Sequence, residues 1–461
     1  MAFVNDWPWR YWARQQPHAT AFIRDDEGWS WSWRKLADDV DTRASALIRQ
    51  GVTEGSGVAL RGRNSGEMLL SYLALLQCGA RLLPLNPQLP ETQTDVLLPS
   101  LDIRFGLCFS DARWPGEIVS LSAGDDDAAD TVPRTPWDRE RLATMTLTSG
   151  SSGLPKAAVH TFAAHLASAE GVRGLMPYAQ GDSWLLSLPL FHVSGQGIVW
   201  RWLAAGATLV VRPSHTLDVA LRGCTHASLV PTQLWRLLSQ GDVPTSLTSV
   251  LLGGAMIPLT LTQQAEAIGI RCWCGYGLTE LASTVCAKRA DGRPGVGMPL
   301  AGRHIKAVDE EIWLRGNSLA AGYWRDGALH PLTDDQGWFH TRDRGCWDGS
   351  EWRIMGRLDN QFFSGGEGVQ PEDVEAVLLQ HPAVEFACVV PVDDVEFGQR
   401  PVVVVEMAGE CDLTTLRDWL APQLAGYQRP VAFYHLPGTL KNGGIKISRQ
   451  QVAAWVRRQR G

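Results

Sequence analysis

Residues 148–156, with the sequence TSGSSGLPK, carry side-chain types that suit the binding of phosphate. Hydroxyl groups donate hydrogen bonds, glycine lets backbone N–H groups turn toward an anion, and lysine adds a positive charge. The preceding residues 143–147 predict a strand. We therefore expect a phosphate-binding loop that follows a strand and is formed by Thr148, Ser149, Gly150, Ser151, Ser152, Gly153 and Lys156.

This loop differs from the GxxxxGK[ST] loop of kinases and GTPases. Counted from Gly150, the next glycine and the lysine arrive too early, and Ala157 stands where a metal-binding hydroxyl would be needed. Taken alone, the segment would suit a flexible surface loop equally well. Its interpretation therefore depends on the other motifs of the chain.

Those motifs follow the loop in a fixed order: LPLFHVSG at 188–195, GGA at 253–255, GYGLTE at 275–280, TRD at 341–343, GRLD at 356–359, SGGE at 364–367 and GGIKISR at 443–449. Together with the loop, this set resembles the adenylate-forming superfamily, which contains acyl-CoA synthetases, luciferases and non-ribosomal adenylation domains. The resemblance covers essentially the whole chain, and seven motifs in sequence leave little room for chance.

The resemblance implies an ATP-dependent acid–thiol ligase. A carboxylate is a poor acyl donor, so it first attacks the α-phosphate of ATP, which yields an acyl-adenylate and pyrophosphate. A thiol then takes the acyl group and AMP leaves. Coenzyme A is the implied thiol, and Mg²⁺ accompanies ATP. Because two anions meet in the first step, the site needs cations and oriented hydrogen-bond donors.

The resemblance also assigns roles in the nucleotide site. Residues 148–156 would hold the β- and γ-phosphates, Thr279 would contact the α-phosphate, and Glu280 would bind Mg²⁺, which favours carboxylate and phosphate oxygens. Asp343 would accept hydrogen bonds from both ribose hydroxyls. The adenine would stack on the ring of Tyr276, near the backbone of Gly253, Gly254 and Ala255, and Arg357 would also bind ATP.

Lys446 is the implied adenylation residue, which would bridge the substrate carboxylate and the α-phosphate. The glycine that usually precedes this lysine is replaced by Ile445, and Lys441 lies nearby, but only Lys446 is followed by the Ile-Ser-Arg pattern. In the family the small domain rotates between the two half-reactions about a hinge residue, here Asp359. That rotation would bring a narrow tunnel for coenzyme A to the site, lined by Ser364, Gly365, Gly366 and Glu367.

The nature of the acid is indicated by residues 191–202. Relatives that activate amino acids commonly place an aspartate where this chain has His192, whereas several acyl- and aryl-CoA ligases carry an aromatic residue or a histidine there. A helix that begins near Ser194 would form the wall of the acyl pocket and carries the cation Arg201. If Arg201 faced the pocket, the substrate would need a second anion, because a buried unpaired guanidinium is costly. Alternatively, Trp200 and Trp202 would stack on an outward-pointing Arg201.

A closer resemblance favours the inward orientation. Residues 145–151, 154–161, 187–197, 364–368 and 440–449 are similar to ligases of the family that activate an aromatic dicarboxylate. One carboxylate is adenylated and the other stays charged, so Arg201 and Ser194 would hold the second carboxylate. Two alternatives are another acyl- or aryl-CoA ligase and a non-catalytic nucleotide-binding relative.

The elements that must position these residues predict an α/β protein. Helical spacing at 33–48 and 68–76 alternates with short apolar runs at 58–60, 184–188, 208–211, 226–230, 250–252 and 271–274. We expect a large N-terminal domain, residues 1–358, with largely parallel sheets and a β-rich subdomain past residue 300. A small mobile α+β domain, residues 359–461, would contain a helix at 371–380 and strands at 386–391 and 401–406.

Composition adds exclusions. The 461 residues carry a net charge of −7, which creates no field that attracts nucleic acid, and no apolar run reaches the roughly 18 residues that span a membrane. The start of the chain lacks the features of a secretory signal, so we expect a cytoplasmic protein. Nine cysteines, an odd number, argue against a complete disulfide framework, and Cys272 and Cys274 are expected to be buried thiols. The sequence is compatible with a homo-oligomer.

Overall fold

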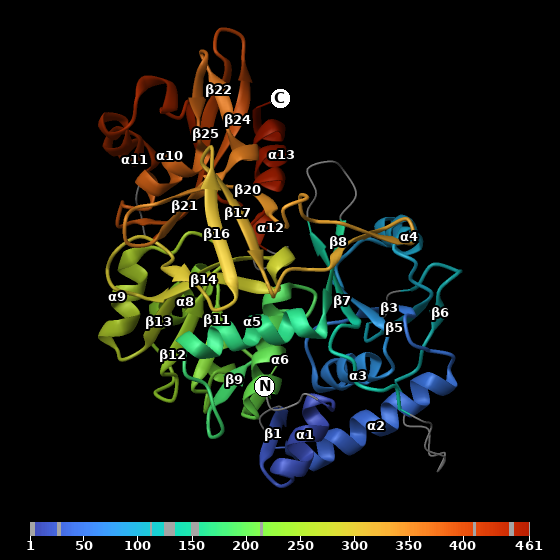
Figure 1. Ribbon diagram of the computed structural model, residues 1–461. Helices are drawn as coiled ribbons and strands as arrows, with labels where there is room; N and C mark the ends of the chain where they lie inside the picture. The colour runs from blue at the N-terminus through green and yellow to red at the C-terminus, as the bar shows by residue number, and fades with distance from the viewer. Residues whose placement is uncertain are drawn as a thin grey trace.

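The computed structural model describes residues 5–24, 29–110, 113–123, 134–148, 156–212, 215–408, 412–441 and 447–460. It has the expected class: large parallel-type sheets with helices form the N-terminal part, a β-rich subdomain follows, and a smaller α+β part ends the chain (Figure 1). No helix in these ranges is long and apolar enough to cross a membrane.

The first large sheet is parallel in its centre and antiparallel at both edges. Its strands lie in the order β15 (Met298–Pro299), β14 (Ser283–Arg289), β13 (Arg271–Leu278), β12 (Ser249–Leu252), β11 (His226–Leu229), β9 (Ser183–Leu185), β10 (Thr208–Val211), β1 (Thr20–Arg24) and β2 (Trp29–Ser32). The predicted run at 208–211 is confirmed. The run at 184–188 leaves the sheet after Leu185, whereas the run at 271–274 continues to Leu278.

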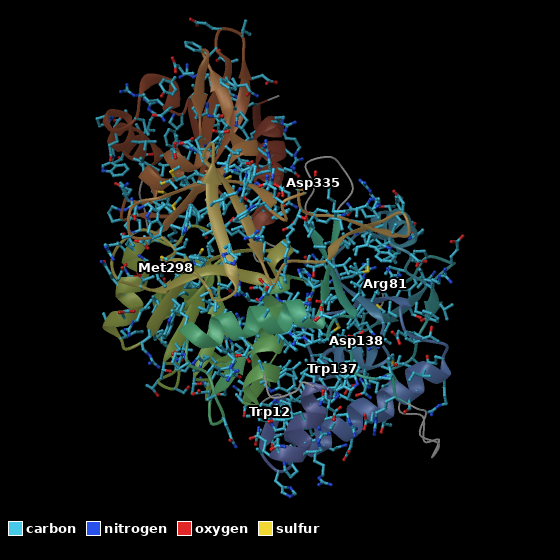
Figure 2. The ribbon with its side chains drawn as sticks, viewed as in Figure 1. Trp12, Arg81, Trp137, Asp138, Met298 and Asp335 are labelled. Carbon is cyan, nitrogen blue, oxygen red and sulfur yellow. The ribbon has the colours of Figure 1, made fainter. Side chains whose placement is uncertain are left out.

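The second large sheet combines a parallel half with an antiparallel half. Its order is β19 (Ala328–His330), β18 (Gly322–Arg325), β8 (Lys156–Thr161), β7 (Leu142–Thr148), β4 (Arg81–Leu85), β3 (Gly57–Arg61), β5 (Phe105–Cys108) and β6 (Val119–Ser120). In Figure 2 Arg81 lies on this sheet; its guanidinium carbon is 3.6 Å from the centroid of the Trp324 ring.

Helices cover both sheets and fill the space between them. Figure 1 shows α5 (Phe162–Leu175) and α6 (Val193–Ala205) in this central layer, and their facing residues are buried. Trp12, labelled in Figure 2, donates from Nε1 to the carbonyl of Leu203, 2.7 Å away, and so joins the N-terminal helix to α6. The remaining helices of the large part are α1 (Pro8–Gln15), α2 (Trp33–Arg49), α3 (Gly66–Gln77), α4 (Glu91–Ser100), α7 (Leu217–Ala220), α8 (Pro231–Gln240) and α9 (Leu259–Ala267).

Local sequence explains where several helices begin and end. Ser32 accepts a hydrogen bond from the backbone N–H of Lys35, which caps α2 in the way that serine commonly does. Helix α6 ends at Gly206, whose φ of 66° is a left-handed conformation that glycine adopts without a Cβ clash. The predicted helices at 33–48 and 68–76 are confirmed as α2 and α3.

The β-rich subdomain expected past residue 300 is an antiparallel sheet. Its strands lie in the order β16 (Arg303–Val308), β17 (Glu311–Gly316), β20 (Phe339–Trp347) and β21 (Trp352–Arg357). Figure 1 places it between the large part and the C-terminal part.

The C-terminal part is an antiparallel sheet to which one parallel strand is added. It contains β22 (Phe362–Ser364), β23 (Glu367–Val369), β24 (Val384–Asp394), β25 (Gly398–Met407) and β26 (Ala432–His435). The helices are α10 (Pro371–Leu378), α11 (Leu413–Leu420), α12 (Gly438–Lys441) and α13 (Arg449–Arg460). The predicted helix at 371–380 is two residues shorter, and both predicted strands are confirmed with longer bounds.

Candidate active site

The GYGLTE motif, residues 275–280, occupies the second half of β13 and the turn that joins β13 to β14. Strand β13 includes Tyr276 and Gly277, and a short 3-10 helix, η1 (Thr279–Leu281), forms the turn. A Cβ on Gly277 would lie 2.0 Å from the carbonyl oxygen of Ser283, so only glycine fits in this strand pair. After the turn, Ala282 and Ser283 have φ of 51° and 102°. Non-glycine residues in such conformations store strain that the surroundings must hold, as at many functional sites.

The carboxylate of Glu280 lies in this turn and is 8% exposed. Its Oε1 accepts a hydrogen bond from the hydroxyl of Tyr323 on β18, 2.7 Å away. Thr279, the other polar residue of the turn, is half-buried. The motif therefore presents one buried acid, Glu280, next in sequence to one half-buried hydroxyl, Thr279.

Three motifs that lie far apart in the sequence meet at Asp343. Tyr276 donates from its hydroxyl to Asp343 Oδ2 at 2.5 Å, and Arg357 Nη1 donates to Asp343 Oδ1 at 3.2 Å. Burial and the Asp343 charge both raise the pKa of Tyr276 well above its ordinary value, so the phenol stays protonated and donates. The glycine motif joins the same corner, because a Cβ on Gly253 would lie 3.4 Å from the carbonyl oxygen of Gly275. Gly254 and Ala255 follow it and are exposed.

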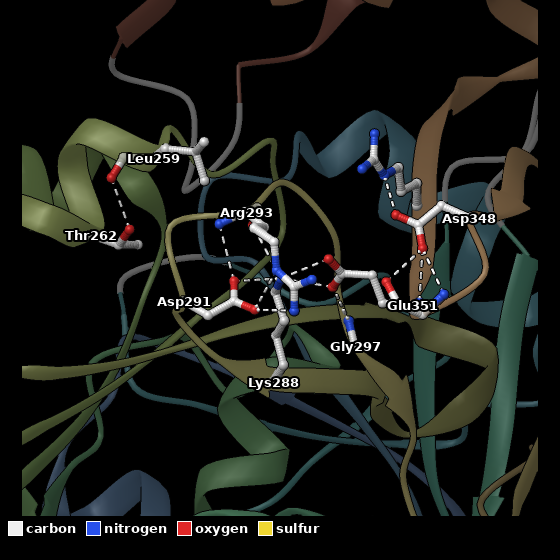
Figure 3. Close-up of polar contacts among 10 residues, drawn as sticks. Leu259, Thr262, Lys288, Asp291, Arg293, Gly297, Asp348 and Glu351 are labelled. Carbon is white, nitrogen blue, oxygen red and sulfur yellow. Dashed lines mark hydrogen bonds and ion pairs between the residues drawn. The ribbon is translucent and has the colours of Figure 1, made fainter.

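A second contact fixes the β13–β14 hairpin to the subdomain sheet (Figure 3). Lys288 on β14 forms ion pairs with Glu351, at 2.7 Å, and with Asp291, at 2.8 Å. Glu351 is 4% exposed and also accepts a hydrogen bond from the backbone N–H of Gly297. This pair is not predictable from the sequence, because no local spacing relates Lys288 to Glu351. It holds the strands of Tyr276 and Asp343 in a fixed relation.

The two described ends of the phosphate loop are partners in one strand pair. Thr148, the last residue of β7, lies opposite Lys156, the first residue of β8. The loop therefore joins two antiparallel strands rather than a strand and a helix, and this geometry separates it from the GxxxxGK[ST] loop. The Lys156 ammonium lies 5.2 Å from the centroid of the Tyr323 ring. Ser149, Gly150, Ser151, Ser152 and Gly153 lie outside the described residues.

His192 and Ser194 lie at the start of α6. His192 precedes the helix, is exposed, and lies 4.7 Å from the Phe191 ring between centroids. A Cβ on Gly195 would lie 2.1 Å from the carbonyl oxygen of Pro189, so glycine permits the close turn into the helix. Ser194 is half-buried and shares a helix face with Arg201, seven residues further on.

Arg201 points into the protein and is 2% exposed. Its Nη2 donates to Ser228 Oγ at 3.2 Å, and its guanidinium carbon lies 4.7 Å from the centroid of the Trp184 ring. The alternative of an outward-pointing side chain stacked on Trp200 and Trp202 is therefore wrong. No described residue places a carboxylate within ion-pair distance of Arg201, and Nε has no hydrogen-bond partner among them. Burial lowers the pKa of Arg201 to about 9, and the electrostatic interaction with Tyr178 opposes this shift.

In the C-terminal part, Asp359 lies in the short helix η2 (Leu358–Asn360) and forms ion pairs with Arg342 at 3.1 Å and Arg357 at 3.0 Å. Ser364 is fully buried, whereas Gly365, Gly366 and Glu367 are exposed. Lys446 lies outside the described residues. Its neighbour in sequence Lys441 pairs with Glu406 at 2.6 Å.

The arrangement suits a nucleotide with a bound Mg²⁺. Among the described residues no group of three or more His, Cys, Asp or Glu side chains is placed to hold a metal. Glu280 supplies a single buried carboxylate, and Mg²⁺ is usually bound by one or two carboxylates together with substrate phosphates. Lys156 and Thr148 mark the place where those phosphates would lie.

Comparisons with known proteins show which family the chain is similar to. A family model described as AMP-binding enzyme matches residues 9–324, and one described as AMP-binding enzyme C-terminal domain matches residues 373–444. The chain is 56% identical to the 2-succinylbenzoate–CoA ligase of Salmonella typhimurium, with 98% of each chain covered. It is 55% identical to the enzyme of the same name from Escherichia coli K12, with 99% of each covered.

The chain is also similar to solved structures of such ligases over nearly its whole length. An arginine-to-lysine variant of Escherichia coli MenE with bound OSB-AMS is 54% identical, has a TM-score of 0.94 and is aligned over 98% of this chain and 99% of that one. The Bacillus subtilis o-succinylbenzoate CoA synthetase in complex with ATP and magnesium ion is 26% identical, with a TM-score of 0.84 over 93% and 95%. The chain therefore belongs to the AMP-binding enzyme family.

Proposed function

We propose that the chain is an o-succinylbenzoate–CoA ligase of menaquinone biosynthesis, which converts o-succinylbenzoate, ATP and coenzyme A to o-succinylbenzoyl-CoA, AMP and pyrophosphate. The observation that carries the substrate is Arg201: a buried guanidinium with no carboxylate partner among the described residues. O-succinylbenzoate has two carboxylates, so the succinyl carboxylate can react while the benzoate carboxylate neutralises Arg201.

The first half-reaction needs two anions to approach each other. A succinyl carboxylate oxygen attacks the α-phosphorus and the bond to pyrophosphate breaks. In this proposal Lys446 neutralises both groups in the transition state, Lys156 and the loop hold the departing phosphates, and Asp343 fixes the ribose. Bound Mg²⁺, held by Glu280, supplies further charge neutralisation on the phosphates. Such preorganised charges typically contribute the largest share of catalysis.

The second half-reaction requires Lys446 to leave. We propose that residues 359–461 rotate about Asp359 against residues 1–358, so that Ser364, Gly365, Gly366 and Glu367 reach the site and coenzyme A enters. The thiol attacks the acyl carbon, and the bond to AMP breaks. Two features support this proposal: Asp359 lies just after the end of β21, and its ion-pair partners among the described residues are the exposed side chains of Arg342 and Arg357.

A coupled assay tests the substrate. Purified protein with ATP, Mg²⁺ and coenzyme A is supplied with o-succinylbenzoate, benzoate, succinate or octanoate, and pyrophosphate and the thioester are followed. We expect selectivity for o-succinylbenzoate, with AMP as the nucleotide product. Preference for a monocarboxylate would indicate another aryl- or acyl-CoA ligase, and no pyrophosphate with any acid would indicate a non-catalytic nucleotide-binding protein.

A pair of lysine variants tests the assignment of the adenylation residue. Lys446→Ala should reduce the rate of pyrophosphate release roughly 10²–10³-fold, or about 3–4 kcal/mol, the size found for one preorganised charge. Lys441→Ala is the matched control, because Lys441 is held by Glu406. The opposite ranking of the two variants would overturn the assignment. A cytoplasmic location and the assembly of copies into a homo-oligomer stay predictions from the sequence.

A further inference from the structure

One short segment, residues 320–323, joins the two halves of the nucleotide site. The backbone N–H of Ala320 donates to the carbonyl of Glu280 at 2.7 Å, and that of Ala321 donates to the carbonyl of Val159 on β8 at 2.8 Å. Strand β18 then pairs with β8, so that Tyr323 lies opposite Ala158. The segment therefore contacts both the turn that carries Glu280 and the hairpin that carries the phosphate loop.

The hydroxyl of Tyr323 fixes the direction of the Glu280 carboxylate. It donates to Oε1 at 2.7 Å, and no described residue donates to Oε2. The backbone around Glu280 is already held by Ala320 and by the hydroxyl of Ser168, which donates to the carbonyl of Ala282 at 2.6 Å. The orientation of the Glu280 carboxylate then depends on the side-chain torsions of this residue. With Oε1 occupied, Oε2 is the oxygen left for a cation.

The ring of the same tyrosine faces the lysine of the phosphate loop. The ammonium of Lys156 lies 5.2 Å from the ring centroid, within the range in which a cation is attracted to an aromatic face. Tyr323 is partly buried in this contact. One side chain thus contacts the carboxylate and the ammonium that the proposed reaction places around the phosphates of ATP.

We propose that Tyr323 is a positioning residue that sets the metal-binding carboxylate Glu280 through its hydroxyl and the phosphate-binding ammonium Lys156 through its ring. This inference deepens the proposed function and rests on its assignment of Glu280 and Lys156 to ATP and Mg²⁺. It separates into two parts, because the hydroxyl can be removed while the ring is kept.

Two variants separate the parts, with the binding of ATP measured by calorimetry in Mg²⁺ and in EDTA. Tyr323→Phe should weaken binding in Mg²⁺ about 10-fold, the size of one hydrogen bond to a charged group, and leave binding in EDTA unchanged. Tyr323→Leu should in addition weaken binding in EDTA about 3-fold, because the ring is lost. The same Tyr323→Phe protein should need about 10-fold more Mg²⁺ for half-maximal pyrophosphate release at an unchanged kcat.

Tyr434→Phe is the matched control, since it removes the same hydroxyl from a tyrosine of the C-terminal part that packs against Trp455. Thermal unfolding of each variant excludes loss of fold as the cause. Equal weakening in Mg²⁺ and EDTA for Tyr323→Phe, or an unchanged Mg²⁺ requirement, would overturn the proposal. Because calorimetry needs no acid, a wrong acid in the assay would overturn the proposed function and leave this test intact.

Discussion

The nucleotide end and the acyl end of the candidate site differ in the partners that the protein provides for their buried charges. At the nucleotide end, Asp343 is bound by Tyr276 and Arg357, and Glu280 is bound by Tyr323. At the acyl end, Arg201 is more deeply buried than either acid, yet its polar contact among the described residues is one serine hydroxyl. Among the described residues, Asp343 therefore has a charged counterpart in Arg357, whereas Glu280 and Arg201 each contact a neutral hydroxyl and Arg201 has no carboxylate partner.

From this difference we expect the protein to supply the oriented groups that bind ATP and the substrate to supply the charge that pairs with Arg201. A buried charge without a partner costs several kcal/mol, and the cost is recovered when an opposite charge arrives in good geometry. In the proposed function, the Arg201 end would therefore select a substrate by whether it supplies a carboxylate. The nucleotide end would be preorganised, so that ATP meets donors and acceptors whose directions are already set.

Arg201→Leu tests the acyl end of the comparison and should give the largest effect. We expect kcat/KM for the dicarboxylate to fall about 10²–10⁴-fold, or about 3–5 kcal/mol, since this is the cost of removing one member of a buried charge pair. KM for ATP should change little. The free energy of unfolding should stay equal or rise, because an unpaired buried charge is replaced by an apolar side chain.

Steady-state kinetics and urea unfolding of the same protein measure both quantities. The exposed Arg222 provides the control, and Arg222→Leu should change neither. Equal increases of KM for the acid and for ATP would contradict the assignment of Arg201. A fall in the free energy of unfolding as large as that caused by removing one partner of a buried ion pair would also contradict this assignment.

Asp343→Asn should give the next largest effect and tests the nucleotide end. The variant keeps the shape of the side chain but loses the charge that faces Arg357 and the ribose. We expect KM for ATP to rise about 10–100-fold, since hydrogen bonds to a charged group contribute about 1.5–3 kcal/mol. KM for the acid should stay the same.

The control for this variant is Asp418→Asn, because Asp418 also pairs with an arginine, Arg417, at 3.9 Å, and both side chains are exposed. Exposed pairs contribute little, so the control should bind ATP normally. An ATP affinity that is unchanged in Asp343→Asn would remove Asp343 from the nucleotide site.

Tyr276→Phe should give the smallest effect and sharpens the idea of preorganisation. The ring that we expect beneath adenine is kept, while Asp343 Oδ2 loses its internal donor. We expect the free energy of unfolding to fall by about 1 kcal/mol and KM for ATP to rise less than in Asp343→Asn. A larger increase of KM than in Asp343→Asn would mean that the hydroxyl itself, rather than the acid it holds, binds the nucleotide.

Much of the architecture is predictable from short patterns. The apolar spacing that defines α2 and the β-branched run of β10 are local, and the structure confirms them. Strand β13 shows where local signals fail: Gly275, Tyr276 and Gly277 have the composition of a turn. Pairing of Tyr276 with Cys286 on β14 keeps them in the sheet, since tertiary contacts override weak local preferences.

The partners of the site residues are the part that the sequence does not provide. Tyr323 lies 43 residues from Glu280, and Ser228 lies 27 residues from Arg201. Nothing in their local spacing connects them, because the contacts arise where a helix or turn packs against a strand that is distant in sequence. The motif residues themselves were identified through a resemblance of type and order, and their roles stay predictions to be measured.

The C-terminal sheet has a consequence for how such chains are recombined. Val403 and Val405 on β25 belong to one apolar cluster with residues of α10 and α11, while Val402 and Val404 face the opposite side and pack with α13. Both faces of the sheet are thus closed by helices of the same segment. A segment that completes its own interior can be exchanged between homologous chains by joining them near residue 359, with only the contacts across the junction to be matched.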